Sequence, residues 1–226
     1  MAKNSKWQDE YWLLLLQLYL QKPVGIKPMY SKGMVDLSLE LHIAPNMLFN
    51  KMCQIANLET PRVERFWELY GNNPKKLKRA VNLLREMWGF NNALEFYDGV
   101  ETNESFEKDF KPIADSTVLT PMMLTLILDL YFRLTPITMV TETPEVQELA
   151  KMMKIKPEEV VEVMEAFQHC DPYLRSISGR FASAKNRKEM MMGDLALACQ
   201  QVWRRFGNAN PEELASYADQ LKEYFR

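Results

Sequence analysis

The sequence predicts an all-α protein built from two related copies of one helical domain. Apolar residues recur at helical spacing, and clear alternating strand patterns are absent. Thr-Pro and Asn-Pro pairs mark helix starts along the chain. The sequence also matches itself when it is shifted by 112 positions. With 226 residues, 47% of them hydrophobic and 26% charged, the chain is long enough to form two cores.

The internal repeat starts in the first apolar helix and continues through the next two. The shift of 112 positions holds without a gap for about forty residues, and the match resumes at a shift of 136. The second copy therefore carries 24 additional residues, between about residues 171 and 194. A Trp, a Gly-Asn pair and prolines recur in order, which chance rarely produces, so we interpret the pattern as a tandem duplication. The aligned pairs include Leu14/Leu126, Leu16/Leu128, Leu18/Leu130, Tyr19/Tyr131, Leu37/Leu149, Ile43/Ile155, Pro45/Pro157, Met52/Met164, Trp67/Trp203, Gly71/Gly207 and Asn72/Asn208.

Each expected helix is justified by its first residues and its apolar spacing. Five helices are expected to begin at the Pro of a Thr-Pro or Asn-Pro pair. The Thr or Asn side chain can accept a hydrogen bond from a backbone N–H of the first turn, and Pro has no N–H that would be left unpaired. Gly71, Gly89 and Gly207 stand where helices should end. The five pairs begin at Thr60, Asn73, Thr120, Thr143 and Asn210. The predicted helices are residues 5–21, 34–42, 46–57, 61–70, 74–88, 121–133, 144–153, 157–169, 189–206 and 211–225.

These helices group into two domains, residues 1–91 and residues 119–226. The linker between them, residues 92–118, holds seven acidic residues against two lysines, which is typical of a solvated segment. The second domain contains the basic insert of about residues 171–194.

In each copy a short helix is followed by a tight turn and a second helix, at residues 34–57 and again at residues 144–169. This pattern resembles the helix-turn-helix superfamily of DNA-binding proteins. The resemblance implies that the outer face of the second helix enters the major groove. The glycine often found in such turns is absent from both copies. The apolar positions that carry the resemblance are Val35, Leu37, Leu41, Ile43, Leu48 and Met52, and then Val146, Leu149, Ala150, Met153, Ile155, Val160 and Met164.

About fifty residues of the first copy are also similar to the N-terminal helical module of some prokaryotic restriction-type endonucleases. The similar positions are Leu13, residues 17–20, residues 37–41, Lys51, Met52 and residues 58–61. No nuclease domain follows in this sequence, so the similarity implies no catalytic residue.

The second helix of the first hairpin is the candidate base-reading element. Asn46, Asn50 and Gln54 are expected to face outward with Lys51 beside them, and amide side chains pair bidentately with adenine. The second copy has Glu158, Glu162 and Ala166 at these places, and phosphate repels carboxylates. We therefore expect the first copy to read DNA. An ordinary solvated helix face has the same composition, and the sequence leaves that alternative open.

Two basic segments are predicted to contact phosphates. Lys75, Lys76 and Arg79 stand with Lys78 in the first turns of a helix, where the helix dipole disfavours cations. The insert is basic, acid-free from residue 173 to residue 188 and rich in Ser, as are loops that follow a phosphate backbone. Its bases are Arg175, Arg180, Lys185, Arg187 and Lys188. Solvated loops and helix faces of no special function remain the alternative for both segments.

Catalytic, metal and cofactor chemistry is not predicted. The two histidines, His42 and His169, occupy non-equivalent positions, and the three cysteines lie too far apart for a metal site or a disulfide framework. No phosphate-binding glycine motif occurs. We therefore expect a protein that is not an enzyme and binds no cofactor. Acids instead of bases precede the apolar run of residues 11–16, so we expect no membrane segment and a cytoplasmic location.

Together these patterns predict a DNA-binding, transcription-regulatory protein whose partner is double-stranded DNA. The alternative is a non-catalytic protein-interaction or scaffold module with degenerate helix-turn-helix-like domains. Near-balanced charge, with 28 basic and 30 acidic residues, and the acidic second copy favour the alternative. Fifteen methionines are also typical of adaptable contact surfaces, so a protein partner or a homodimer is part of the prediction.

Overall fold

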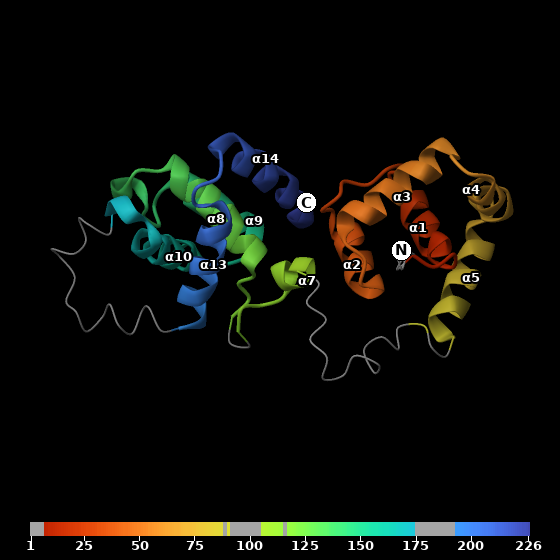
Figure 1. Ribbon diagram of the computed structural model, residues 1–226, viewed down its shortest axis with the longest axis horizontal. Coiled ribbons are helices and arrows are strands. Elements are labelled where there is room, and N and C mark those ends of the chain that lie inside the picture. Colours follow the sequence, from red (N-terminus) through yellow and green to blue (C-terminus); the bar gives the residue numbers. More distant parts are fainter. Residues whose placement is uncertain (1–6, 88–89, 91–104, 115–116, 175–192) are drawn as a thin grey trace, which may run out of the picture. The chain divides into compact units, whose positions relative to one another are not determined.

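The computed structural model describes residues 7–87, 90, 105–114, 117–174 and 193–226. Within these ranges the chain is all-helical and contains no strand, as the sequence predicts. Every helix in the same ranges is too short or too polar to cross a bilayer. The chain divides into two compact units, unit 1 (Met1–Glu104) and unit 2 (Ser105–Phe225) (Figure 1).

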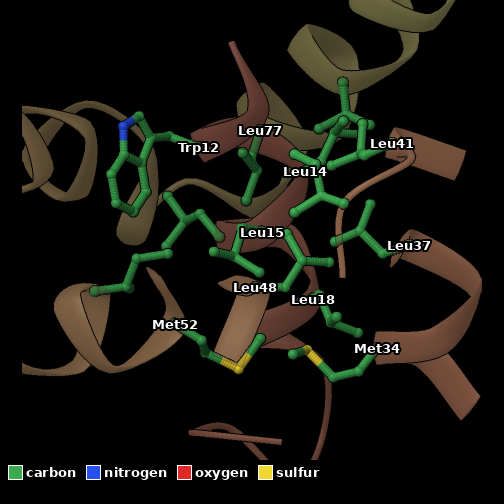
Figure 2. Close-up of a cluster of buried hydrophobic side chains, with 14 of the residues drawn as sticks. Trp12, Leu14, Leu15, Leu18, Met34, Leu37, Leu41, Leu48, Met52 and Leu77 are labelled. Carbon is green, nitrogen blue, oxygen red and sulfur yellow. The ribbon is translucent and has the colours of Figure 1, made fainter. Parts of the chain in front are cut away.

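Unit 1 is built around its first helix. Helix α1 (Tyr11–Leu20) packs against every other helix of the unit, and Leu14, Leu15 and Leu16 along it are at most 2% exposed. Figure 2 shows side chains of α1, α2, α3 and α5 converging on one apolar cluster. The other elements are α2 (Lys32–Leu41), α3 (Pro45–Asn57), α4 (Pro61–Phe66), the π-helical turn η1 (Trp67–Gly71) and α5 (Pro74–Glu86).

Unit 2 is likewise built around one helix. All residues of α8 (Pro121–Arg133) from Met122 to Tyr131 are buried, and α8 packs against α7, α9, α10, α13 and α14. Its buried polar side chains are satisfied within the helix, since Thr125 donates to the Pro121 carbonyl (3.0 Å) and Asp129 pairs with Arg133 (2.8 Å). The other elements are α7 (Ser105–Phe110), η2 (Pro136–Thr138), α9 (Pro144–Met153), α10 (Pro157–Cys170), α13 (Asp194–Phe206), α14 (Pro211–Lys222) and η3 (Glu223–Phe225).

Side-chain caps are present at four of the five helix starts that the Thr-Pro and Asn-Pro pairs predict. Thr60, Asn73, Thr120 and Asn210 each accept a bond from a backbone N–H in the first turn, at 3.0–3.3 Å. Thr143 differs, because its hydroxyl donates instead to the Thr138 carbonyl and α9 begins without a side-chain cap. The sequence therefore places these starts correctly even where the cap itself is missing.

The turns of the two hairpins have the same backbone geometry at an offset of 112 residues. His42 and Lys154 end α2 and α9 in the left-handed region, with φ of 53° and 58°. The next residue in each case, Ile43 or Ile155, donates its N–H to the carbonyl five positions earlier, at 3.1 Å. The turn thus keeps the left-handed position that glycine usually occupies, although neither copy has glycine there.

A repeated aromatic contact follows the hairpin in each unit. The rings of Tyr19 and Trp67 lie 5.9 Å apart at 78°, and those of Tyr131 and Trp203 lie 6.0 Å apart at 78°. Each indole lies against the glycine four residues later in the sequence. A Cβ at Gly207 would stand 2.8 Å from the Trp203 indole, and a Cβ at Gly71 would stand 3.1 Å from the Trp67 indole. Close approach of the ring, rather than a positive φ, therefore accounts for glycine at these two places.

Two predictions about the ends of elements were wrong. Trp7 and Gln8 are not helical, and α1 begins at Tyr11. Trp7 packs on Trp12, with ring centroids 4.9 Å apart, and residues five apart do not share a helix face.

Part of the segment expected to be a solvated linker is also structured. Residues 105–110 form α7, in which Glu107 is buried beside Lys111 and Asp109 pairs with Arg205 at 2.9 Å.

Candidate nucleic-acid interface

Helix α3 presents an uncharged polar outer face. Leu48, Met52 and Ile55 are buried against the core at 3% exposure or less, and they fix the orientation of the helix. Asn46 and Asn50 are exposed on the other side, as the sequence predicts. Helix α3 contains no acidic residue. Amide side chains can form two hydrogen bonds with the edge of adenine, and no carboxylate of α3 stands beside them to repel phosphate.

Lys51 and Gln54, which the sequence placed on the same face, have partners inside unit 1. The Lys51 ammonium lies 5.3 Å from the ring centroid of Trp7 and 5.1 Å from that of Trp12. It also donates to the Gln54 Oε1 atom at 3.2 Å. A cation over two indoles is stabilised by their ring faces, so Lys51 fixes Trp7 to α3.

Helix α5 carries the basic face. Leu77, Val81 and Leu84 bury its inner side, which packs against α1. Its outer side presents four exposed bases, which we call the α5 basic face: Lys75, Lys76, Lys78 and Arg79. The Lys76 ammonium lies 5.0 Å from the Tyr70 ring, and none of the four forms an ion pair with another described residue. Lys75 and Lys76 stand in the first turn of α5, where the helix dipole makes a cation unfavourable by about 0.3–1 kcal/mol, so the dipole does not account for this arrangement.

Other bases of unit 1 serve the fold. Arg85 makes two hydrogen bonds to the Glu40 carboxylate, at 2.7 and 2.8 Å, and so joins the ends of α5 and α2. Arg62, at the start of α4, pairs with Asp9 at 2.5 Å. Fewer bases of unit 1 are therefore available to a ligand than the number of Lys and Arg residues in the sequence indicates.

The two predicted contact sets lie on different helices of unit 1. Figure 1 shows α3 (orange) and α5 (yellow) on different sides of α1 (red), and both pack against it. Asn46 and Asn50 thus share the exposed face of α3, and Lys75, Lys78 and Arg79 share an exposed face of α5.

Helix α10 of unit 2, which follows the second hairpin turn, has an outer face of opposite character. Glu158, Glu162 and Glu165 are exposed along it, while Val163, Met164 and Phe167 are fully buried. Glu159 accepts a bond from the Lys156 N–H at 2.8 Å and caps the helix. A row of carboxylates repels a phosphate backbone, so the structure offers no surface for nucleic acid on this helix.

The bases of the insert lie outside the described residues. This applies to Arg175, Arg180, Lys185, Arg187 and Lys188. Their predicted role as phosphate contacts stays a prediction.

Buried titratable groups occur in unit 2, where they are shielded. Burial raises the pKa of the Cys199 thiol to about 12, with the Cys170 thiol adding to the effect. Burial also raises the pKa of Tyr131, whose hydroxyl donates to Asp171 at 2.9 Å. Both groups hold their protons at neutral pH, which is the opposite of what a nucleophile needs. Among the described residues, no three His, Cys, Asp or Glu side chains are grouped as a metal site requires.

Comparisons with models of protein families, with curated proteins and with solved structures found no match. The function proposed below therefore depends on the residues of this chain.

Proposed function

We propose that this chain is a DNA-binding, regulatory protein whose unit 1 contacts double-stranded DNA. The observation that carries the proposal is the α5 basic face, where exposed cations stand without acidic partners in the described part of the chain. Phosphate contacts of this kind supply most of the affinity of proteins for DNA. The insert bases Arg175, Arg180, Lys185, Arg187 and Lys188 belong to the same proposed phosphate-contacting set.

We further propose that the two units arose by duplication of one helix-turn-helix-like domain. The left-handed turn residues His42 and Lys154, at equivalent positions, support this origin. The Tyr-Trp contact, nearly identical in distance and angle in the two units, supports it as well. In this proposal the base-reading helix of unit 1 is α3, through Asn46 and Asn50, and α10 has lost that role because its outer face is acidic.

A second function has one observation in its favour. Unit 2 exposes large apolar side chains near the beginning of its hairpin, with Ile137 at 88%, Val140 at 42% and Phe132 at 41% exposure. Exposed large apolar side chains of this kind are typical of surfaces that bind other proteins. Protein interaction through unit 2 is therefore the alternative to DNA binding, and the two are compatible in one chain.

The experiment that tests the proposal compares two triple variants with equal change in net charge. The variant K75A/K78A/R79A removes three bases of the α5 basic face. The control K151A/K156A/R204A removes three exposed bases of unit 2 that form no ion pair with described residues. Binding to a random-sequence duplex is followed by fluorescence anisotropy at several salt concentrations.

We expect the α5 variant to bind all sequences more weakly and to reduce the slope of log K against log salt by about 2–3, at about 0.9 for each phosphate contact. The control should retain the wild-type slope. Equal losses in both variants would show that only net charge matters, and unchanged binding by the α5 variant would exclude its basic face as the binding surface.

A further inference from the structure

We propose that the outer face of α3 selects A·T base pairs, with Met47 contacting the thymine methyl group and Asn50 contacting adenine. This inference depends on the proposed function, since it names the bases that unit 1 would read.

The position of Met47 suits such a contact. Its side chain is 43% exposed at the N-terminal end of α3, between the exposed residues Asn46 and Asn50. The adjacent Leu48 is fully buried, so the helix cannot rotate to bury Met47 without losing its anchor. In helix-turn-helix proteins the N-terminal residues of the second helix are the ones that meet base edges.

The chemistry of the face favours A·T over G·C. Guanine is read by Arg or Lys at its O6 and N7 atoms, and cytosine by a carboxylate at its N4 amino group. Lys51 is the only charged residue of α3, and its ammonium lies over Trp7 and Trp12. What remains on the outer face is an amide, which pairs with the N6 and N7 atoms of adenine, and a thioether chain, which packs on the thymine methyl.

Asn46 and Asn50 differ in what they can offer. The Asn46 Oδ1 atom already accepts a bond from the Met47 N–H at 2.7 Å. Asn50 is exposed and its side chain makes no hydrogen bond with another described residue, so the amide donor and acceptor are both available. Asn50 is therefore the residue assigned to the two-bond contact with adenine.

The test uses the full chain and three duplexes of equal length and charge. They are an alternating A·T duplex, the same duplex with deoxyuridine in place of thymidine, and an alternating G·C duplex. Deoxyuridine lacks only the methyl group that Met47 would contact. M47A is compared with L197A, which truncates an exposed side chain of α13 in unit 2, and N50A tests the adenine contact.

The wild type should prefer the A·T duplex and should bind the deoxyuridine duplex about fourfold more weakly for each methyl contact, at the usual gain for burying one such group. M47A should bind the A·T and deoxyuridine duplexes equally, and L197A should behave as the wild type. N50A should weaken the preference for A·T over G·C and should still bind the deoxyuridine duplex less tightly than the A·T duplex, because Met47 is retained.

The outcomes separate this inference from the proposed function. Salt-dependent binding of equal strength to all three duplexes would overturn the inference and leave the proposed function standing. No binding to any duplex at low salt would overturn both. The comparison of duplexes uses the wild-type protein, so it decides the question even if M47A fails to fold.

Discussion

Lys51 shows how a single residue can look functional in the sequence and serve the fold in the structure. From the sequence, a lysine among three amides on one helix indicates contact with nucleic acid. In the structure its ammonium is held by the rings of Trp7 and Trp12 and by Gln54. The signal that was missed is the Trp7 side chain, which is too far from Lys51 in the sequence for helical spacing to reveal the contact.

Replacing Lys51 should therefore affect stability. We expect K51A to lower the free energy of unfolding by about 1 kcal/mol, because the contact of the cation with the indoles is lost. K51R should remain close to the wild type, since a guanidinium also stacks on indole. Urea denaturation followed by tryptophan fluorescence measures both variants. A K51A protein as stable as the wild type, with weakened DNA binding, would return Lys51 to the proposed interface.

The repeated Trp and Gly pair is a case in which the sequence predicted a residue's place and the structure supplied the cause. The sequence placed Gly71 and Gly207 at helix ends, and helices do end there. Glycine is common at helix ends because it adopts positive φ without steric cost. Gly207 instead has φ of −63° and stands where a Cβ would meet the Trp203 carbonyl at 2.7 Å. The Trp203 indole would also lie 2.8 Å from that Cβ, and its orientation follows from packing on Tyr131 and Phe132, which sequence spacing does not give.

At the scale of the element, helix boundaries were the most predictable feature. Pro at the first helical position and Thr or Asn before it define a helix start through local chemistry alone, so α4, α5, α8, α9 and α14 begin where expected. The short helices α7 and η2 were not predicted, because six- and three-residue segments carry too little periodicity. The sequence also could not predict how α3 and α5 are arranged around α1, because that arrangement depends on tertiary packing.

The hairpin turn gives a prediction about one element. Lys154 is exposed and holds a left-handed φ of 58°, a conformation that costs an ordinary residue more than glycine. We expect K154G to raise the free energy of unfolding by about 0.5–1 kcal/mol. K151G, at an exposed helical position three residues earlier, should lower it by a similar amount. Chemical denaturation of the two variants compares them directly, and destabilisation by both would contradict the assigned turn geometry.

For the whole molecule, the shielded groups of unit 2 predict how stability depends on pH. Cys199 and Tyr131 have raised pKa values in the folded state, so folding keeps protons that the unfolded chain releases. Their stabilising contribution is complete below about pH 9 and declines as the pH rises toward 12. For Cys199 alone the decline approaches about 1.4 kcal/mol per pH unit.

Urea midpoints between pH 8 and pH 11 measure this decline. C199A removes one of the two groups, so its midpoint should fall less steeply with pH than that of the wild type. Identical pH dependence in the two proteins would show that Cys199 ionises as freely in the folded chain as in the unfolded one.

The central claim is that unit 1 binds double-stranded DNA through exposed cations. The most direct test is fluorescence anisotropy of the wild-type protein with a random-sequence duplex between 50 and 200 mM salt. Phosphate contacts from Lys75, Lys78 and Arg79 alone predict a slope of about −2.7 and a loss of affinity of about fortyfold over this range, and contacts from the insert bases would make the slope steeper. No binding at 50 mM salt, or binding that does not change with salt, would contradict the claim and favour protein interaction as the function of this chain.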